Sequence, residues 1–392
     1  MHRIVLLAAA LTFGVFGALG VGGSAFAQKA FKVANLSPLS GPAAAFGIGV
    51  NRGIELAAED IGVFTVAGEK YKVELVPFDT VYDPAKTVAA LNRAILNDGI
   101  KYGFILGAGV HAPILPIIRQ HQFFDIFLGA AGKGVTNAEN PTVFRFMASS
   151  DQLYHTFTGP VYEKLAIKRV ASLVPNDDLG RFDARTLKEI VTGPLKGKVE
   201  YVGEEFFERG AKDFQAALLR LLAQKPDAID TDASPTGTIA LIAKQARELG
   251  YEGYFINSTA VLEAKAIVDI AGKAADKIVA YRIWAKSPTP LYDQLAERHL
   301  KKYKEPALGI IWESYAAMRW VVEVVQKADT FDTRKVSDAL AASNFANHPF
   351  GPASWGAEKT YGIKRQIQTP LPASIIKDGK WESLDVRVGK LD

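Results

Sequence analysis

Residues 37–47 form the first stretch of the sequence in which polar groups are placed to bind a ligand. This stretch reads Ser-Pro-Leu-Ser-Gly-Pro-Ala-Ala-Ala-Phe-Gly, and its serines, prolines and glycines end the apolar run 33–36. After it, apolar residues from Val50 to Ile61 recur at the spacing of one helix face. A loop that enters a helix presents free backbone N–H groups, and such groups bind anions. The alternative is an ordinary first turn of a parallel sheet without a ligand.

The sequence contains none of the residue patterns that build familiar enzyme active sites. It has no cysteine nucleophile, no Gly-x-Ser-x-Gly elbow and no His-Glu-x-x-His motif. Segment 374–377 fits the Ser-x-x-Lys pattern, but it is strand-like and lacks the partner motifs. Segment 47–53 lacks the spacing of a dinucleotide loop, and segment 132–134 lacks the rest of a phosphate-binding loop. The six histidines have no ligand spacing, so we expect no catalysis, no metal and no cofactor.

Strand, loop and helix patterns alternate along most of the chain. Apolar patterns predict strands at 33–36, 71–78, 102–106 and 124–128, and a second series at 169–174, 198–202, 227–231 and 253–257. The alternation with helices predicts the fold class α/β, with two doubly wound parallel-sheet lobes. Ligands of such sheets bind at the carboxyl ends of the strands. Two lobes whose strand ends face each other would therefore enclose a cleft, which a hinge could close on a ligand.

The pattern changes after about Lys277. A strand is expected through Trp284, and three helices follow it, at about 289–303, 308–327 and 332–341. The last fifty residues are expected to form short strands and turns.

Residues 1–27 have the features of a secretory signal peptide. Arg3 supplies a positive start, residues 4–21 are almost all apolar, and Ala25-Phe26-Ala27 is a small-x-small cleavage site. The alternative is an N-terminal membrane anchor, because the apolar run is long for a signal peptide. The Ala-rich and Gly-rich composition and the cleavage site favour export to the periplasm, with cleavage after Ala27.

The composition indicates a large protein without strong affinity for polyanions. The formal net charge of the full chain is +4, and the densest basic run, 301–304, fits a solvated helix end. A nucleic-acid partner is therefore not expected. The chain has no cysteine, so its core must be stable without disulfides, and its length suits two domains.

Several motifs, in this order and spacing, resemble one family. They are Ser40-Gly41-Pro42-x-Ala44-x-x-Gly47, Asp83-Pro84 followed by Asn97-Asp98-Gly99-Ile100, Ser149-Ser150-Asp151-Gln152, Asp213-Phe214, Pro226-Asp227-Ala228-Ile229, Gln245-Ala246-Arg247-Glu248-Leu249-Gly250, Tyr315-Ala316-Ala317 and Gly351-Pro352. Over about residues 31–390 the chain resembles the periplasmic solute-binding proteins of branched-chain amino acid ABC importers, the leucine/isoleucine/valine-binding type. No single motif is specific to this family, but the order and spacing of the motifs together are.

The resemblance implies a type I periplasmic binding fold with two lobes and three crossovers. We expect the crossovers near 146–150, 278–284 and 350–356. The implied N-terminal lobe comprises 28–148 plus 282–352, and the C-terminal lobe comprises 149–281 plus 353–392. The implied activity is binding of a small molecule by a monomer, which would then dock on the membrane permease of an ABC importer.

The resemblance also assigns ligand positions, and several of them depart from the family pattern. The positions of the serine and threonine hydroxyls that hold an amino acid's carboxylate correspond here to Gly109 and Gly132. The position of the carboxylate that holds the ammonium corresponds to Thr259 or nearby Ser258, and the tyrosine positions correspond to Leu179 and the region of Pro235. A buried ammonium without a carboxylate would be costly. We therefore expect a small organic acid with an aromatic or branched aliphatic body rather than an amino acid.

Other residues complete the predicted site. Lys133 or His111, with the helix that begins near Ala112, could receive the ligand's carboxylate. Phe46, the aromatic residue of the first loop, would cover the apolar body. Asp232 could bind a distal hydroxyl and is the one candidate left for an ammonium. The remaining lining residues are Val110, Ala130 and Trp284.

Each of these residues has a plain structural alternative. Lys133 could be a solvated loop lysine, His111 and Asp232 could cap helices, and Phe46 could belong to the core. Two other functions also stay open. The chain could bind branched-chain or other amino acids, or it could be the ligand-sensing partner of a signalling receptor.

Overall fold

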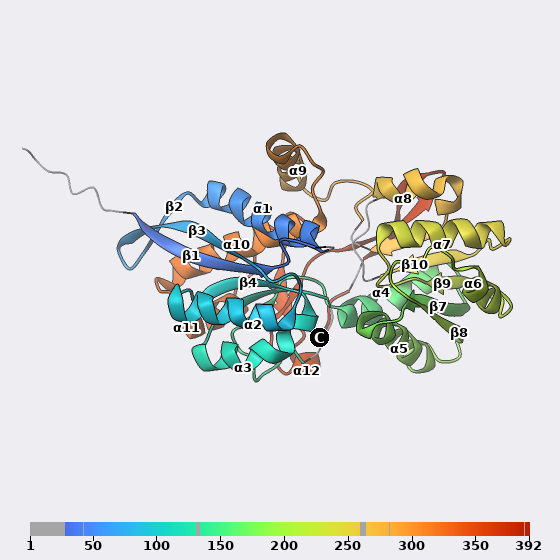
Figure 1. Ribbon diagram of the computed structural model, residues 1–392, viewed down its shortest axis with the longest axis horizontal. Helices are drawn as coiled ribbons and strands as arrows, with labels where there is room; N and C mark the ends of the chain where they lie inside the picture. Colours follow the sequence, from blue (N-terminus) through green and yellow to red (C-terminus); the bar gives the residue numbers. More distant parts are fainter. Residues whose placement is uncertain (1–27, 42, 131–133, 259–263, 282, 388) are drawn as a thin grey trace, which may run out of the picture.

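The computed structural model describes residues 28–41, 43–130, 134–258, 264–281, 283–387 and 389–392. The predicted signal peptide, residues 1–27, lies outside these described residues, so its cleavage stays a prediction. Two α/β lobes lie side by side along the longest axis of the molecule (Figure 1). This arrangement confirms the predicted fold class of two doubly wound lobes.

The first lobe is built on an eight-stranded sheet. Its strands, in spatial order, are β12 (Ser354–Gly356), β13 (Gln366–Gln368), β6 (Val143–Arg145), β5 (Phe124–Leu128), β4 (Tyr102–Leu106), β1 (Lys29–Ser37), β3 (Glu69–Asp79) and β2 (Val63–Val66). The five strands from β6 to β3 pair in parallel, and β2 and β12 pair antiparallel at the two edges. The carboxyl ends of the parallel strands therefore lie along one edge of the lobe.

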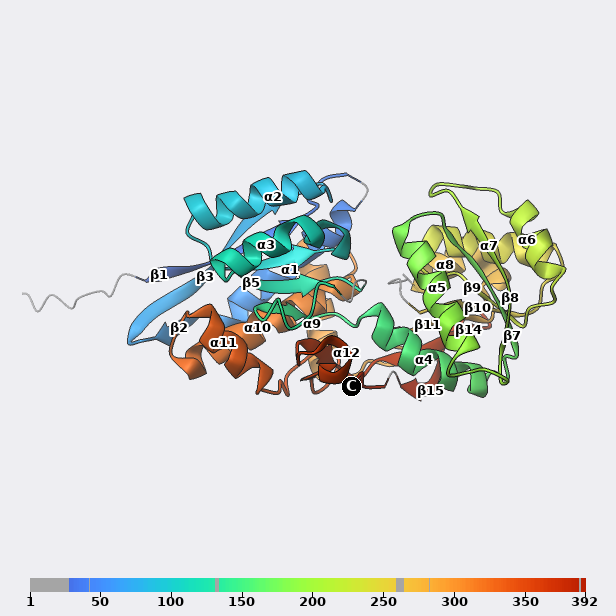
Figure 2. The ribbon, with the colours of Figure 1, turned by 90° about the horizontal axis from the view of Figure 1, so that it is seen from below.

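Helices cover both faces of this sheet. They are α1 (Ala44–Ile61), α2 (Pro84–Asn92), a π-helical turn (Arg93–Asn97), a 3-10 turn (Ala108–Val110), α3 (His111–His121), α9 (Pro290–Tyr303), α10 (Gly309–Ala328), α11 (Thr333–Ala341) and α12 (Glu358–Tyr361). Figure 2 shows α2 and α3 on one side of the sheet and α10 and α11 on the other. Helix α1 packs closely against α10, because a Cβ atom at Gly53 would lie 2.6 Å from the backbone oxygen of Ile311.

The second lobe is built on a seven-stranded sheet. Its strands, in spatial order, are β15 (Lys380–Arg387), β14 (Pro372–Lys377), β11 (Ile278–Tyr281), β10 (Tyr254–Asn257), β9 (Ala228–Asp230), β7 (Arg169–Pro175) and β8 (Glu200–Phe207). Its helices are α4 (Ser150–Lys164), α5 (Asp178–Thr192), α6 (Gln215–Leu222), α7 (Thr236–Glu248), α8 (Ala264–Ala271) and a 3-10 turn (Gly272–Ala275). Figure 1 shows α7 and α8 on one side of the sheet and α4 and α5 on the other.

Among the described residues, three connections link the lobes, at 146–149, 283–289 and 369–371, and the C-terminal residues 389–392 return from the second lobe to the first, where the N–H of Ala357 donates to the Leu391 carbonyl at 2.8 Å. The third differs from the prediction, which placed it at 350–356 and assigned residues from 353 onward to the second lobe. Strands β12 and β13 pair with each other and with β6, so 354–368 belong to the first lobe. The sequence offered only short, weakly patterned strands here, and pairing with a distant strand decides where they lie.

Side-chain hydrogen bonds fasten the connections to one another. The amide nitrogen of Gln152, just after the first connection, donates to the side-chain oxygen of Gln368 at 3.1 Å. The amide nitrogen of Gln366 donates to the carbonyl of Met147 at 2.8 Å. Two of the three connections are therefore linked by buried side-chain amides, which make a defined hinge.

Two strand predictions also need correction. The strand expected through Trp284 is β11, and it ends at Tyr281. The strand expected at 198–202 runs from Glu200 to Phe207, because it lies at the edge of the sheet and its exposed, polar half hides the apolar pattern. Within the described residues, no helix is long and apolar enough to cross a membrane.

Candidate functional site between the strand ends

Asp79 joins two loops at the carboxyl ends of β1 and β3. Its carboxylate accepts the hydroxyl of Ser40 at 2.6 Å and the backbone N–H groups of Leu39 and Val81 at 2.8 and 3.0 Å. The hydrogen bond from Ser40 makes the largest contribution to the lowered pKa of Asp79, because it stabilises the charged form. The charged carboxylate thus fixes the loop that carries Tyr82 against the loop that enters α1.

Tyr82 lies over the loop that follows β4. Its ring is so close to Gly107 that a Cβ atom there would be 2.6 Å from the phenol oxygen. Gly107 has a φ of +96°, which favours glycine independently. The Tyr82 hydroxyl oxygen also lies beside Gly109, because a Cβ atom there would be 3.8 Å from it. Burial of this end of the ring raises the pKa of Tyr82, although the residue as a whole is 46% exposed.

His111 is a buried structural residue, which contradicts its predicted contact with a ligand anion. Its side chain is fully buried; Nδ1 lies 2.7 Å from the carbonyl of Gly107, and Nε2 lies 3.0 Å from Oδ2 of Asp125. Both ring nitrogens are therefore used. Burial raises the pKa of Asp125, and the interaction with His111 opposes that shift. The His111–Asp125 pair thus holds the turn at Gly107 in place.

The other predicted residues of the first lobe lie in different environments. Phe46 is 41% exposed in the first turn of α1, so it is not part of the core. Val110 is buried. Gly109 is exposed next to the Tyr82 hydroxyl. The structure thus brings Phe46 and Gly109 to the same edge of the lobe, among the loops at the strand ends, and adds Tyr82 to them.

Ala130 acts through its backbone. Its carbonyl accepts the N–H of Ser150 at 2.7 Å and Nη1 of Arg145 at 3.0 Å. The Arg145 guanidinium is completely buried and stacks over the ring of Phe127. The loop that begins at Ala130 is therefore fastened to the first hinge connection. The predicted residues Gly132 and Lys133, further along this loop, lie outside the described residues, and so does Thr259.

Asp232 is buried in the second lobe, which contradicts its predicted role as a ligand contact. Its carboxylate accepts the hydroxyls of Tyr154 and Ser258 and the backbone N–H of Ser258. It is not a helix cap either, because α7 begins after Pro235 without a side-chain cap. Asp232 thus joins the loop after β9, the loop after β10 and helix α4.

A second carboxyl group, Asp230, lies beside Asp232. Its Oδ1 accepts the backbone N–H of Asp232 at 3.2 Å. Burial and then the neighbouring charge of Asp232 raise the pKa of Asp230 well above its usual value. Ionisation of Asp230 is thus disfavoured, while the neighbouring Asp232 carboxylate accepts hydrogen bonds from Tyr154 and Ser258.

Arg209 connects three strand ends of the second lobe. It follows β8; its Nε donates to Asp177, which lies after β7, and its Nη1 donates at 3.1 Å to the carbonyl of Ala233, which lies after β9. Asp177 also caps α5 by accepting the N–H of Gly180 at 3.0 Å. Burial opposes the ionisation of Asp177, but the hydrogen bond from Arg209 prevails and its pKa is lowered. Leu179 is half-buried in the first turn of the same helix.

Trp284 lies in the second hinge connection rather than at a strand end. Its ring centroid is 6.2 Å from that of Phe350, and the Arg387 guanidinium lies 5.2 Å above it. These contacts pack Trp284 within the hinge, and its contact with a ligand in the cleft stays a prediction.

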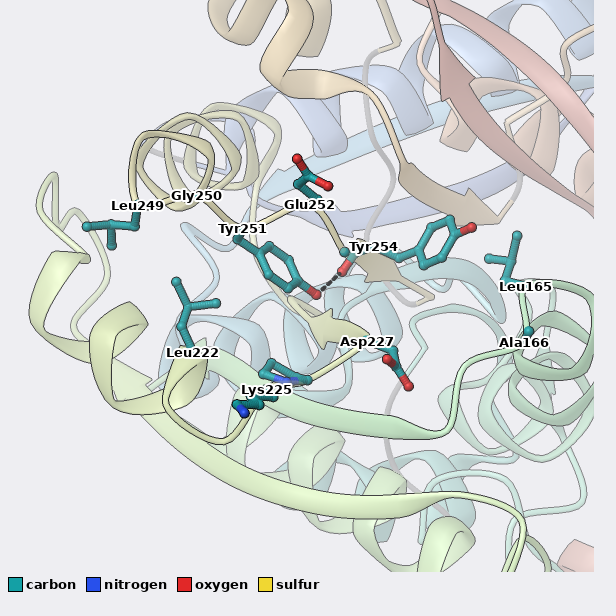
Figure 3. A pocket seen from close by; sticks show the side chains of 12 residues that line it. Leu165, Ala166, Leu222, Lys225, Asp227, Leu249, Gly250, Tyr251, Glu252 and Tyr254 are labelled. Atoms are coloured by element: carbon teal, nitrogen blue, oxygen red, sulfur yellow. Dashed lines mark hydrogen bonds between the residues drawn. The ribbon is translucent and has the colours of Figure 1, made fainter.

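Two surface pockets of the described residues lie away from these loops. One of about 470 Å³ is at the opposite end of the second lobe, where Asp227, Tyr251 and Tyr254 contribute to its wall (Figure 3). Its polar groups already have partners, because Asp227 accepts two backbone N–H groups and the Tyr251 hydroxyl donates to the Tyr254 carbonyl. No cluster of His, Asp or Glu among the described side chains could hold a metal ion.

The comparisons with known proteins agree with this architecture. A model of the periplasmic binding protein family matches residues 30–370. The chain belongs to this family. A Leu/Ile/Val-binding protein of Citrobacter freundii is 26% identical over 344 residues, which cover 87% of this chain and 90% of that protein. A leucine-, isoleucine-, valine-, threonine- and alanine-binding protein of Pseudomonas aeruginosa is 25% identical and covers 84% and 88% of the two chains.

Solved structures of periplasmic binding proteins share the fold. A leucine-binding protein from Thermotoga maritima has a TM-score of 0.74 at 24% identity and covers 91% of this chain and 98% of its own. A solute-binding protein from R. palustris in complex with benzoate has a TM-score of 0.73 at 20% identity and covers 92% and 98%. At these identities the likeness establishes the type I periplasmic binding fold and leaves the ligand open.

Tyr82, Arg209 and Asp177 were not predicted from the sequence. Tyr82 had a usable signal, because it is an aromatic residue in a loop directly after a predicted strand, the same placement that singled out Phe46. Asp177 also followed a predicted strand and precedes a helix as a capping residue does. Arg209 had no such signal, because the carboxyl half of β8 was not recognised as a strand.

Proposed function

We propose that this protein is the extracytoplasmic solute-binding subunit of an ABC importer, and that its two lobes close on a small organic acid. The expected ligand carries one carboxylate and an aromatic or branched aliphatic body. Binding rather than catalysis is supported by the family match and by relatives that are named as binding proteins. Delivery to a membrane permease, a monomeric state and export with cleavage after Ala27 belong to the same proposal.

The observation that carries the ligand class is the burial of Asp232. An amino acid needs a carboxylate for its ammonium group, because a buried ammonium without a counter-charge is costly. Asp232 was the candidate for this role, and its carboxylate is committed to Tyr154 and Ser258. The exposed loops offer the backbone N–H of Gly109 and the guanidinium of Arg209, both of which favour an anion. The benzoate complex of a protein with the same fold is consistent with this ligand class.

A branched-chain amino acid is the second candidate. It is favoured by the relatives, several of which are named as Leu/Ile/Val-binding proteins. A ligand-sensing partner of a signalling receptor would use the same closure with a different membrane protein. It differs from the importer subunit in what the closed form binds, not in the ligand site.

Thermal unfolding with a panel of ligands tests the ligand class. The panel contains benzoate, 3-methylbutanoate, an α-keto acid, leucine and valine. A ligand at about a hundred times its dissociation constant stabilises the native state by roughly 2.7 kcal/mol, which raises Tm by several degrees in a protein of this size. We expect a shift with one or more of the acids and none with leucine or valine. A shift with leucine and none with the acids would contradict the organic-acid proposal and establish the second candidate.

A further inference from the structure

Tyr82 is held in a strained backbone conformation at the edge of the first lobe. Val81 and Tyr82 have φ angles of +51° and +60°, in the left-handed region that residues with side chains rarely adopt. Each such residue costs of the order of 1–2 kcal/mol relative to an ordinary conformation. The Asp79 carboxylate stabilises the turn by accepting the N–H of Val81. The strain is therefore maintained by specific contacts, and its effect is to place the Tyr82 ring on the loop after β4.

The loop after β4 is shaped to receive this ring. Gly107 leaves room for it, because a Cβ atom there would lie 2.6 Å from the Tyr82 hydroxyl oxygen and 2.8 Å from Cζ. The same hydroxyl lies beside Gly109, where a Cβ atom would be 3.8 Å from its oxygen. The hydroxyl donates no hydrogen bond to the residues that the structure describes, so its proton is available for a ligand. Tyr82 thus brings a hydroxyl from the loop after β3 to the loop after β4.

Arg209 presents a cation from the second lobe toward the same place. Its charge and that of Asp177 both act on the Tyr82 hydroxyl, although these residues lie in different lobes. Two of its nitrogens, Nε and Nη1, are used for Asp177 and the Ala233 carbonyl. Its Nη2 group forms no hydrogen bond with any residue that the structure describes. Because Asp177 and Ala233 fix the guanidinium plane, Nη2 is an oriented and charged donor.

We propose that Tyr82 and Arg209 form an anion-binding pair that spans the two lobes and selects a ligand with a carboxylate. The phenolic O–H and the Gly109 loop hold the carboxylate on the first lobe, and Nη2 of Arg209 binds it when the lobes close. The Tyr82 ring lies along the ligand's apolar body. This assignment rests on the proposed function, and it deepens that function by naming the residues that make the site specific for acids.

Isothermal titration calorimetry with benzoate and benzamide tests the pair. Benzamide has the shape of benzoate without its charge, so the ratio of the two affinities reports recognition of the anion. The full chain is purified after export as wild type, Tyr82→Phe, Arg209→Gln and the double variant. We expect Arg209→Gln to weaken benzoate binding about tenfold or more and Tyr82→Phe to weaken it severalfold, with little change for benzamide. The double variant should lose less than the product of the single losses, because both groups bind one carboxylate.

Matched controls separate this effect from a general loss of structure. Tyr71→Phe removes a phenol at the amino end of β3, and Arg220→Gln removes a guanidinium that is paired with Glu205 on the outer side of the second lobe. Both controls should bind benzoate within about twofold of wild type, and all variants should unfold at similar temperatures.

Three results would overturn the inference. The first is benzoate binding by Tyr82→Phe and Arg209→Gln that equals the wild type. The second is tighter binding by Tyr82→Phe, which would mean that the phenol competes with the ligand for Gly109. The third applies if the wild type binds leucine instead of benzoate. The proposed ligand class then fails, and the pair is tested separately by titrating the same variants with leucine, which also has a carboxylate. Leucine affinities equal to that of the wild type would overturn the inference.

Discussion

The first lobe exposes its distinctive side chains at the strand ends, whereas the second lobe buries most of its own. Phe46 and Tyr82 are 41% and 46% exposed. In the second lobe, Asp230 and Asp232 are almost inaccessible. Exposed contacts can bind a ligand without rearrangement, while a buried network can only shape the surface above it. We infer that the first lobe makes the initial contact and that the second closes as a preformed surface, from which Arg209 projects.

The largest expected effect of a single substitution concerns the buried network of the second lobe. Asp232→Ala removes the acceptor for Tyr154 and for two groups of Ser258, so three donors lose their partner. Each unsatisfied buried group costs about 1–3 kcal/mol, and we expect the free energy of unfolding to fall by roughly 3–5 kcal/mol in urea titrations. Asp178→Ala, a change of an exposed carboxylate on the same lobe, is the control and should change it by less than about 1 kcal/mol.

The opposite result would break the comparison between the lobes. If Asp232→Ala unfolded like the wild type and lost ligand binding, Asp232 would be a contact residue after all. The second lobe would then expose its chemistry as the first lobe does, and an ammonium site would be restored.

The pH dependence of stability tests the raised pKa of Asp230. Its pKa is raised in the folded protein by burial and by Asp232, so the folded state binds the proton more tightly than the unfolded state. Stability from this group is complete below the unfolded pKa of about 4 and is lost as the pH rises toward the folded pKa. Asp230→Asn cannot ionise, so its free energy of unfolding, relative to wild type, should increase from pH 4 to pH 8. A constant difference between the two proteins would mean that Asp230 has an ordinary pKa.

Gly107, which leaves room for the Tyr82 ring, offers a smaller and more specific test on the first lobe. Gly107→Ala forces a Cβ atom into the Tyr82 ring and places alanine at a φ of +96°. We expect a loss of about 1–2 kcal/mol in the free energy of unfolding, together with the benzoate defect of Tyr82→Phe. Calorimetry of Gly107→Ala, Tyr82→Phe and the combined variant measures both. If the combined variant loses no more affinity than either alone, the glycine acts through the tyrosine.

What the sequence could predict differs between the fold and the site. Strands β4 and β5 were predicted to the residue, because short apolar runs between glycines and polar caps are unambiguous. The site depended on contacts between segments that the sequence does not relate. His111 and Asp232 were rightly noticed as polar residues after strands. Both are buried, however, and they stabilise their loops through contacts with Asp125 and Tyr154. Tyr82 lies over the strand ends of the first lobe only because Gly107, in the loop after β4, leaves room for its ring.

Phe46 should give the smallest effect on stability and one confined to binding. The side chain lies in the first turn of α1 and is 41% exposed, so Phe46→Ala removes little buried surface and should lower the free energy of unfolding by less than about 1 kcal/mol. If Phe46 covers the ligand's apolar body, that surface becomes buried only in the complex. Its removal should then weaken the binding of benzoate by about 1–2 kcal/mol and that of benzamide equally, since both have the same ring. Equal losses for the two ligands would separate Phe46 from Arg209, whose removal affects the acid alone. A loss of stability in the free protein comparable to the loss in binding would instead place Phe46 in the core of the first lobe.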